Sequence, residues 1–94
     1  MNGGQLYRLI NIFRRLKEGE VVVYRCFMKL PDLGYSVQSA DRVRLPLQEA
    51  ELALHDKQFW ELLIEDAPES RSGLFPTIEE AIADFERAFE EGEP

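Results

Sequence analysis

Residues 21–45 consist of two runs typical of β-strands joined by a short turn, and they predict an antiparallel β-hairpin. The first half is rich in β-branched and aromatic side chains, and Pro31 and Gly34 supply the residues that a short turn requires. Pairing Leu30 with Tyr35 gives a register that sorts the side chains of both strands. One face is then mostly apolar, and the other combines positive charge with apolar surface at Arg25, Phe27, Lys29, Arg42 and Arg44.

The segment before the hairpin, residues 5–17, is spaced as in an amphipathic helix. Its basic residues gather in the expected last turn, where the helix dipole favours cations, and Gly19 is a suitable stop. An isolated two-stranded sheet is only marginally stable, so we expect this N-terminal helix to cover one face of the hairpin. The apolar stripe consists of Leu6, Leu9, Ile10, Phe13 and Leu16.

Residues 47–66 are strong helix formers whose apolar side chains fall on one side of a helix, and they predict a helix after the hairpin. Asp56 interrupts this apolar side, so a helix kinked or split at residues 55–56 is an alternative. A strand over residues 58–65 is a second alternative, because that stretch is also rich in aromatic and branched residues.

The remaining segment predicts a loop followed by a well-defined helix. Proline, glycine and serine break any periodicity in residues 67–76, from which Leu74 and Phe75 are expected to dock inward. Thr77 and Glu80 have the spacing of a capping box at the start of a helix that continues to about residue 90. The expected fold is therefore a single α+β domain over residues 1–94, with an N-terminal helix, an antiparallel hairpin and two C-terminal helices packed on the sheet.

Composition sets bounds on the class of protein. The chain has 94 residues, of which 45% are apolar, so it can bury a core without disulfides, and its one cysteine cannot form an intrachain bridge. No apolar run is long enough to span a membrane, and the first residues lack the pattern of a signal peptide, so we expect a soluble cytoplasmic protein.

Charge is distributed unevenly along the chain. The net charge is −7, yet residues 1–30 carry six basic and two acidic side chains. The global negative charge argues against general binding to nucleic acid, although a local basic patch remains able to attract an acidic partner.

Residue types suited to catalysis are scarce. Cys26 and His55 form the only nucleophile and base pair that the composition allows, and the expected register places Cys26 on the apolar face, where thiols are usually inert. One histidine and one cysteine cannot provide a structural zinc site, and no glycine-rich phosphate loop is present. We therefore expect no catalytic, cofactor-binding or metal-binding residues.

The basic face of the hairpin is the leading candidate for function. It favours a small non-enzymatic module for protein–protein interaction or regulation, with Phe27 as an anchor among Arg25, Lys29, Arg42 and Arg44. Two structural alternatives are that an acidic helix of the same chain covers this face, or that a homodimer forms through the hairpin's face or free edge. Two functional alternatives are a nucleic-acid-associated protein using the same face and an accessory subunit of an enzyme.

Overall fold

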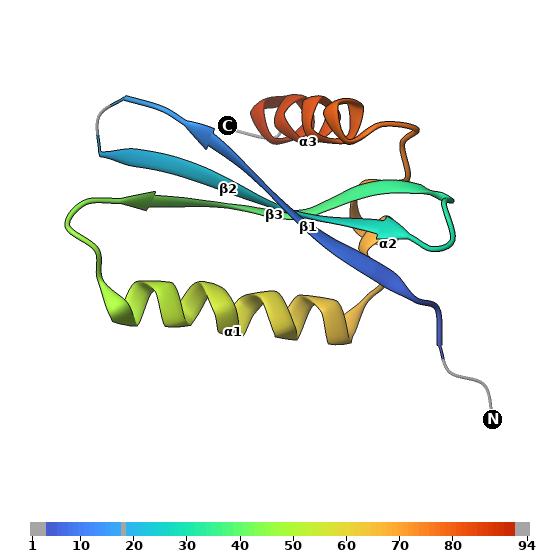
Figure 1. Cartoon of the computed structure of the whole chain (residues 1–94), viewed down its shortest axis with the longest axis horizontal. Helices are drawn as coiled ribbons and strands as arrows, with labels where there is room; N and C mark the ends of the chain where they lie inside the picture. The colour runs from blue at the N-terminus through green and yellow to red at the C-terminus, as the bar shows by residue number, and fades with distance from the viewer. Residues whose placement is uncertain (1–3, 18, 92–94) are drawn as a thin grey trace.

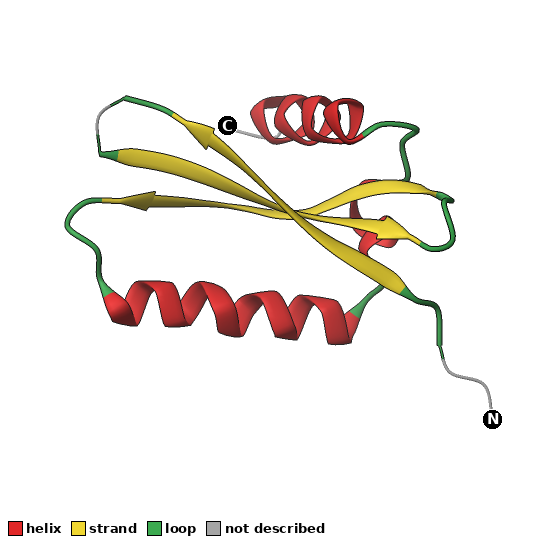
Figure 2. Cartoon of the chain, viewed as in Figure 1, coloured by secondary structure: helices red, strands yellow, loops and turns green. Residues whose placement is uncertain are grey.

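The fold is a three-stranded antiparallel sheet followed by helices, in a computed structural model that describes residues 4–17 and 19–91. The strands lie in the order β1-β2-β3, and their twist makes them cross in projection (Figure 1). Helices α1 and α3 lie on opposite sides of the sheet (Figure 2), and both pack chiefly against β3. The elements are β1 (Tyr7–Arg15), β2 (Glu20–Lys29), β3 (Gly34–Arg44), α1 (Glu49–Glu65), α2 (Pro68–Ser72) and α3 (Ile78–Glu91).

The prediction of an N-terminal helix over residues 5–17 is wrong, because this segment forms β1. It pairs with β2 along its whole length, from Tyr7 opposite Lys29 to Arg15 opposite Val21. The hairpin is therefore part of a larger sheet. The physical reason lies in β2, which is apolar on both faces and so behaves as a central strand that needs a neighbour on each side. Residues 5–17 suit a helix by their spacing, but as a strand they place apolar side chains on both faces of the sheet, and pairing with β2 decides for the strand.

The hairpin forms, but the expected pairing of Leu30 with Tyr35 is wrong, since Tyr35 lies opposite Met28. The register is shifted by two residues, and a shift by an even number leaves the side chains near the turn on their expected faces. Between Arg25 and Cys26 the register shifts, because Cys26 pairs with Val37 and Arg25 pairs with Ser39. The extra residue in β3 reverses the faces expected for residues 39–44.

Each face of the sheet has its own apolar layer. On the α3 side, buried residues of β2, β3 and α3 form one cluster, which is completed by partly buried side chains such as Ile10 and Ile12 of β1. On the α1 side, Val23 and Phe27 are buried together with Phe59. The cluster on the α3 side contains Val22, Tyr24, Cys26, Val37, Ala81 and Ile82.

The helical predictions for the second half of the chain are largely confirmed. Residues 49–65 form one continuous helix, so neither the split at residues 55–56 nor the strand over 58–65 occurs. The backbone N–H of Glu80 donates to the Thr77 hydroxyl, as expected of an N-cap, whereas the Glu80 carboxylate meets that same hydroxyl instead of the Thr77 N–H.

The expected loop over residues 67–76 contains the short helix α2. Phe75 docks inward and forms an antiparallel bridge with Tyr35 through two backbone hydrogen bonds of 2.8 and 2.9 Å. Leu74, by contrast, stays largely exposed. Within the described ranges, none of the helices has the length and apolar character needed to cross a bilayer.

Candidate functional site

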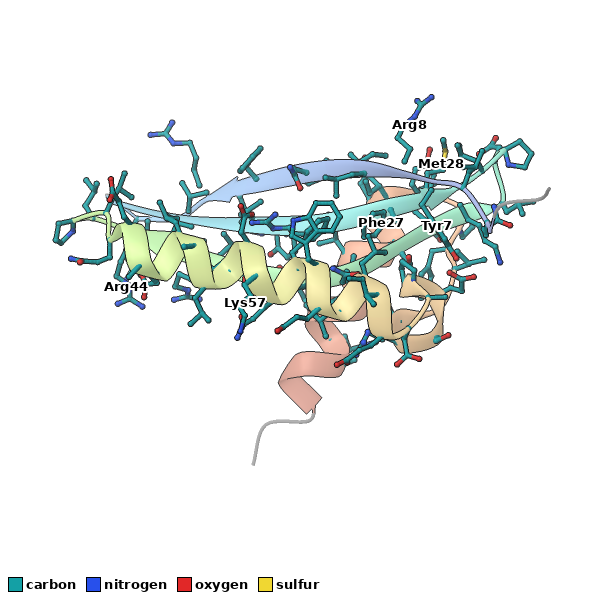
Figure 3. All side chains as sticks on the ribbon, turned by 90° about the horizontal axis from the view of Figure 1, so that it is seen from below. Tyr7, Arg8, Phe27, Met28, Arg44 and Lys57 are labelled. Carbon is teal, nitrogen blue, oxygen red and sulfur yellow. The ribbon has the colours of Figure 1, made fainter. Side chains whose placement is uncertain are left out.

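Phe27, the expected anchor of the basic hairpin face, is buried inside the protein. Its ring stacks on Phe59 of α1 at 5.9 Å and meets the edge of Tyr7 at 6.0 Å. Tyr7 and Phe27 point toward the end of α1 in Figure 3. The burial of Phe27 shows that α1 covers this part of the face, so Phe27 is a core residue of the folded chain.

Arg25 and Lys29 are neutralised by carboxylates of the same chain. Arg25 lies 3.7 Å from Asp41 and 3.5 Å from Asp56 of α1, and its guanidinium sits over the Phe59 ring. Lys29 donates to Glu69 of α2 at 2.7 Å. The structural alternative in which the chain's own acidic helices cover this face is therefore the arrangement found, and it does not favour nucleic-acid binding there.

Arg42 and Arg44 lie on the opposite side of the sheet from Arg25 and Lys29. The bulge in β3 pairs Arg42 with Val22 and Arg44 with Glu20. Both guanidinium groups approach the Glu20 carboxylate, at 3.8 and 3.7 Å. The five residues of the predicted basic face thus do not share one exposed surface, and their role in binding a partner stays a prediction.

Tyr7, Lys29 and Glu69 form a partly buried polar cluster where β1, β2 and α2 meet. The Tyr7 hydroxyl donates to Glu69 at 2.8 Å, and burial together with this carboxylate raises the pKa of Tyr7 to about 12. Burial alone would raise the pKa of Glu69, but hydrogen bonds from Lys29, the backbone and Tyr7 outweigh it and lower that pKa. The cluster is a satisfied ion pair that fastens α2 to the sheet.

A second polar cluster lies on the α3 side. Tyr24 donates to Glu86 of α3, and Arg14 of β1 donates to the Tyr24 hydroxyl at 3.1 Å and lies 3.3 Å from Glu86. Burial and the Glu86 carboxylate raise the pKa of Tyr24. The cluster borders an open groove of about 710 Å³ that Arg42 and Phe85 also line. Its groups satisfy one another, and none of them is activated as a nucleophile.

Cys26 and His55 are not brought together. Cys26 is fully buried in the cluster on the α3 side, whereas His55 belongs to α1 on the other side of the sheet. Burial raises the pKa of the Cys26 thiol to about 11, which makes it unreactive near neutral pH. Among the residues that the structure describes, no group of three or more histidine, cysteine or acidic side chains is placed to hold a metal ion.

The outer edge of β1 is the feature that the sequence interpretation missed. Leu6 accepts from the Leu30 N–H and Leu16 donates to the Glu20 carbonyl, so even-numbered residues of this segment bond to β2. Backbone groups alternate in direction along a strand, and β1 is the end strand of the sheet. In the described part of the chain, the N–H and C=O groups of Tyr7, Leu9, Asn11, Phe13 and Arg15 therefore point outward without a strand partner; we call this set the β1 edge.

Apolar side chains flank the β1 edge. Leu9 is 42% exposed and Phe13 is 64% exposed, although both have the size of core residues. They alternate with Ile10 and Ile12, which face the α3 side and are packed against its core. The sequence carries a weak signal for this strand, because the apolar pairs 9–10 and 12–13 suit both faces of a sheet, but the same residues also have helical spacing.

The two edges of the sheet differ in protection. The outer edge of β3 is bridged by Phe75 and contacted by α2. Gly34 has a φ of +130°, and a Cβ there would lie 3.2 Å from the Phe75 carbonyl, so glycine permits this close approach. Among the described residues, the outer edge of β3 is thus bonded at Tyr35 and Val37, whereas the β1 edge has no such bond.

Comparisons with protein-family models, with curated proteins and with solved structures find nothing that matches this chain.

Proposed function

We propose that this protein is a small non-enzymatic interaction module that binds an extended strand along the β1 edge. The observation that carries this proposal is a nine-residue strand whose outer edge has no strand partner among the described residues and which carries two exposed apolar side chains, Leu9 and Phe13. An incoming strand would satisfy the outward backbone groups and cover those side chains at the same time, which is the physics of strand addition.

The sequence of β1 supports this proposal, because the centre of the strand lacks the usual devices that protect an edge. The strand contains no proline and no lysine, and its pairing with β2 has no bulge. Its charged residues are the arginines at its two ends, Arg8, Arg14 and Arg15, while the centre, from Leu9 to Phe13, is uncharged. The centre is therefore the part best suited to pair with another strand.

Helix α1 adds apolar surface on the same side of the sheet. Trp60 is 58% exposed and Ile64 is 79% exposed. Trp60 meets the edge of the buried Phe59 ring at 5.2 Å, whereas Ile64 follows Lys57 by two turns and lies on the outer side of α1. Trp60 is therefore exposed apolar surface next to the core on the α1 side.

The test is capture of binding partners with an edge variant. Asn11→Pro removes an N–H that points outward, so it spares the ladder with β2 while blocking an added strand. We expect Asn11→Pro to lose partners that the wild-type protein retains. Lys57→Ala is the control, since Lys57 is exposed on α1 and points away from β1 (Figure 3). Equal capture by wild-type protein and Asn11→Pro would contradict the proposal.

A further inference from the structure

We infer that the strand bound at the β1 edge is β1 of a second copy of this chain, antiparallel and centred on Asn11. This inference rests on the proposed function. The inference is based on a symmetry in the sequence of β1. Binding to an unrelated strand would not require such a symmetry. Read outward from Asn11, the strand is nearly a chemical palindrome, with Ile10 and Ile12, then Leu9 and Phe13, then Arg8 and Arg14.

An antiparallel pair of identical strands places residues at equal distances from the centre opposite each other. Pairing about Asn11 sets Leu9 against Phe13 of the other copy on the α1 side, and Ile10 against Ile12 on the α3 side. A slip of one two-residue step sets Leu9 against Asn11 or Arg15 instead. The centred register alone matches apolar side chains on both faces.

The backbone directions agree with this register. The outward groups of β1 belong to odd-numbered residues, and pairing about Asn11 joins odd residues to odd residues. Asn11 lies on the two-fold axis and exchanges both hydrogen bonds with its copy. The product is a continuous sheet with β3 at each end, where Phe75 and Ser72 already bond to the outer backbone groups of Tyr35 and Val37.

One pair in this register is between like charges. Arg8 lies opposite Arg14 of the other copy, and like charges directly across a sheet are unfavourable. Arg14 forms an ion pair with Glu86 at 3.3 Å, so Arg8 of the second copy would lie close to that carboxylate. Arg8 itself extends away from the sheet in Figure 3. Glu86 therefore offsets the repulsion that the palindrome introduces.

Engineered cysteines test the register directly. The one native thiol, Cys26, is fully buried and does not compete in mild oxidation of the folded protein. Asn11→Cys should form a covalent dimer, because residues in a hydrogen-bonded pair have Cα atoms about 5.5 Å apart, within disulfide range. Leu9→Cys alone should form no disulfide cross-link, since its two copies would lie about 13 Å apart along the strands. A mixture of Leu9→Cys and Phe13→Cys should cross-link.

The oligomeric state supplies the second measurement. Wild-type protein should show a concentration-dependent dimer by sedimentation or light scattering, and Asn11→Pro should weaken it by about tenfold or more through the lost hydrogen bonds. Lys57→Cys, on the outer side of α1, is the matched control and should not cross-link.

The outcomes separate the two proposals. A monomeric wild-type protein, or cross-linking by Leu9→Cys alone, would overturn the inference of a centred self-pair. If the wild type is monomeric while Asn11→Pro still loses a captured partner, the second copy is excluded and strand binding at the β1 edge stands. If neither self-association nor capture depends on Asn11, both proposals fail.

Discussion

At the scale of single residues, burial distinguishes charged side chains that form ion pairs within the fold from those exposed to solvent. The guanidinium of Arg25 lies over the Phe59 ring and meets Asp41 and Asp56, and the ammonium of Lys29 meets Glu69. A basic face that looks exposed in the sequence thus becomes the contact between the sheet and its helices. Asp56 and Glu69 lie outside the hairpin, so pairing within it could not reveal them, and Asp41 reaches Arg25 only because the bulge in β3 turns it to that face.

Glu69→Gln should make the stability of the folded protein depend less on pH in acid. The pKa of Glu69 is lowered below its ordinary 4.5 in the folded chain, so its stabilising effect is complete above that value. The effect is lost as pH falls through the lowered pKa. Denaturant unfolding at a series of pH values should show the wild type losing more stability than Glu69→Gln below pH 4.5.

At neutral pH, Glu69→Gln should reduce the free energy of unfolding by about 1 kcal/mol, because both side chains of the pair with Lys29 are partly solvated. Glu61→Gln is the matched control, as Glu61 pairs with Lys57 on the exposed side of α1. An equal pH dependence in the two variants would contradict the role assigned to Glu69.

Phe27→Ala should be among the most destabilising substitutions in the chain. The ring is buried between Tyr7 and Phe59, and its removal leaves a cavity, which typically costs about 3–5 kcal/mol. Phe13→Ala on the neighbouring strand is the control and should change monomer stability far less, because Phe13 is exposed. Thermal unfolding at low protein concentration measures both.

At the scale of elements, the helices could be predicted and the sheet only in part. Helix α3 begins with a local signal at Thr77, and α1 follows a long run of helix formers. The identity of β1 depends on a contact with β2, because the local spacing of residues 5–17 favours a helix. The bulge opposite Arg25 and Cys26 has no local signal either, since the sequence Val37-Gln38-Ser39 is compatible with a regular strand. The extra residue in β3 is why Arg42 and Arg44 were assigned to the wrong face.

Thr77→Ala should destabilise α3. The Thr77 hydroxyl accepts from the Glu80 N–H at 3.1 Å, and loss of such a cap typically costs about 1 kcal/mol. Thr77→Ser keeps the hydroxyl and should retain most of the stability, which chemical denaturation can compare directly. Equal destabilisation by alanine and serine would show that the cap contributes little.

At the scale of the whole molecule, the two rows of amides in β1 should exchange with solvent at different rates. The N–H groups of Arg8, Ile10, Ile12 and Arg14 bond to β2, whereas those of the β1 edge face outward. In dilute solution, hydrogen exchange should be slow for the first set and fast for the second. Raising the protein concentration should slow the outward set alone, because a second strand covers it.

The concentration dependence of these exchange rates distinguishes strand pairing between two copies from slow exchange within a monomer. Outward amides that remain fast at every concentration would exclude strand pairing between copies. Amides of β3 serve as an internal control, since Tyr35 already bonds to Phe75 in the monomer.

The bulge has a consequence for how the length of this chain can vary. Cys26 pairs with Val37 and Arg25 with Ser39, so Gln38 is a residue of β3 that the ladder skips. Deleting Gln38 should leave every later partner in place, Asp41 beside Arg25 included, at the expense of the bond from Gln38 to the Phe59 carbonyl. Position 38 is therefore where evolution can shorten the strand without rearranging either side of the sheet.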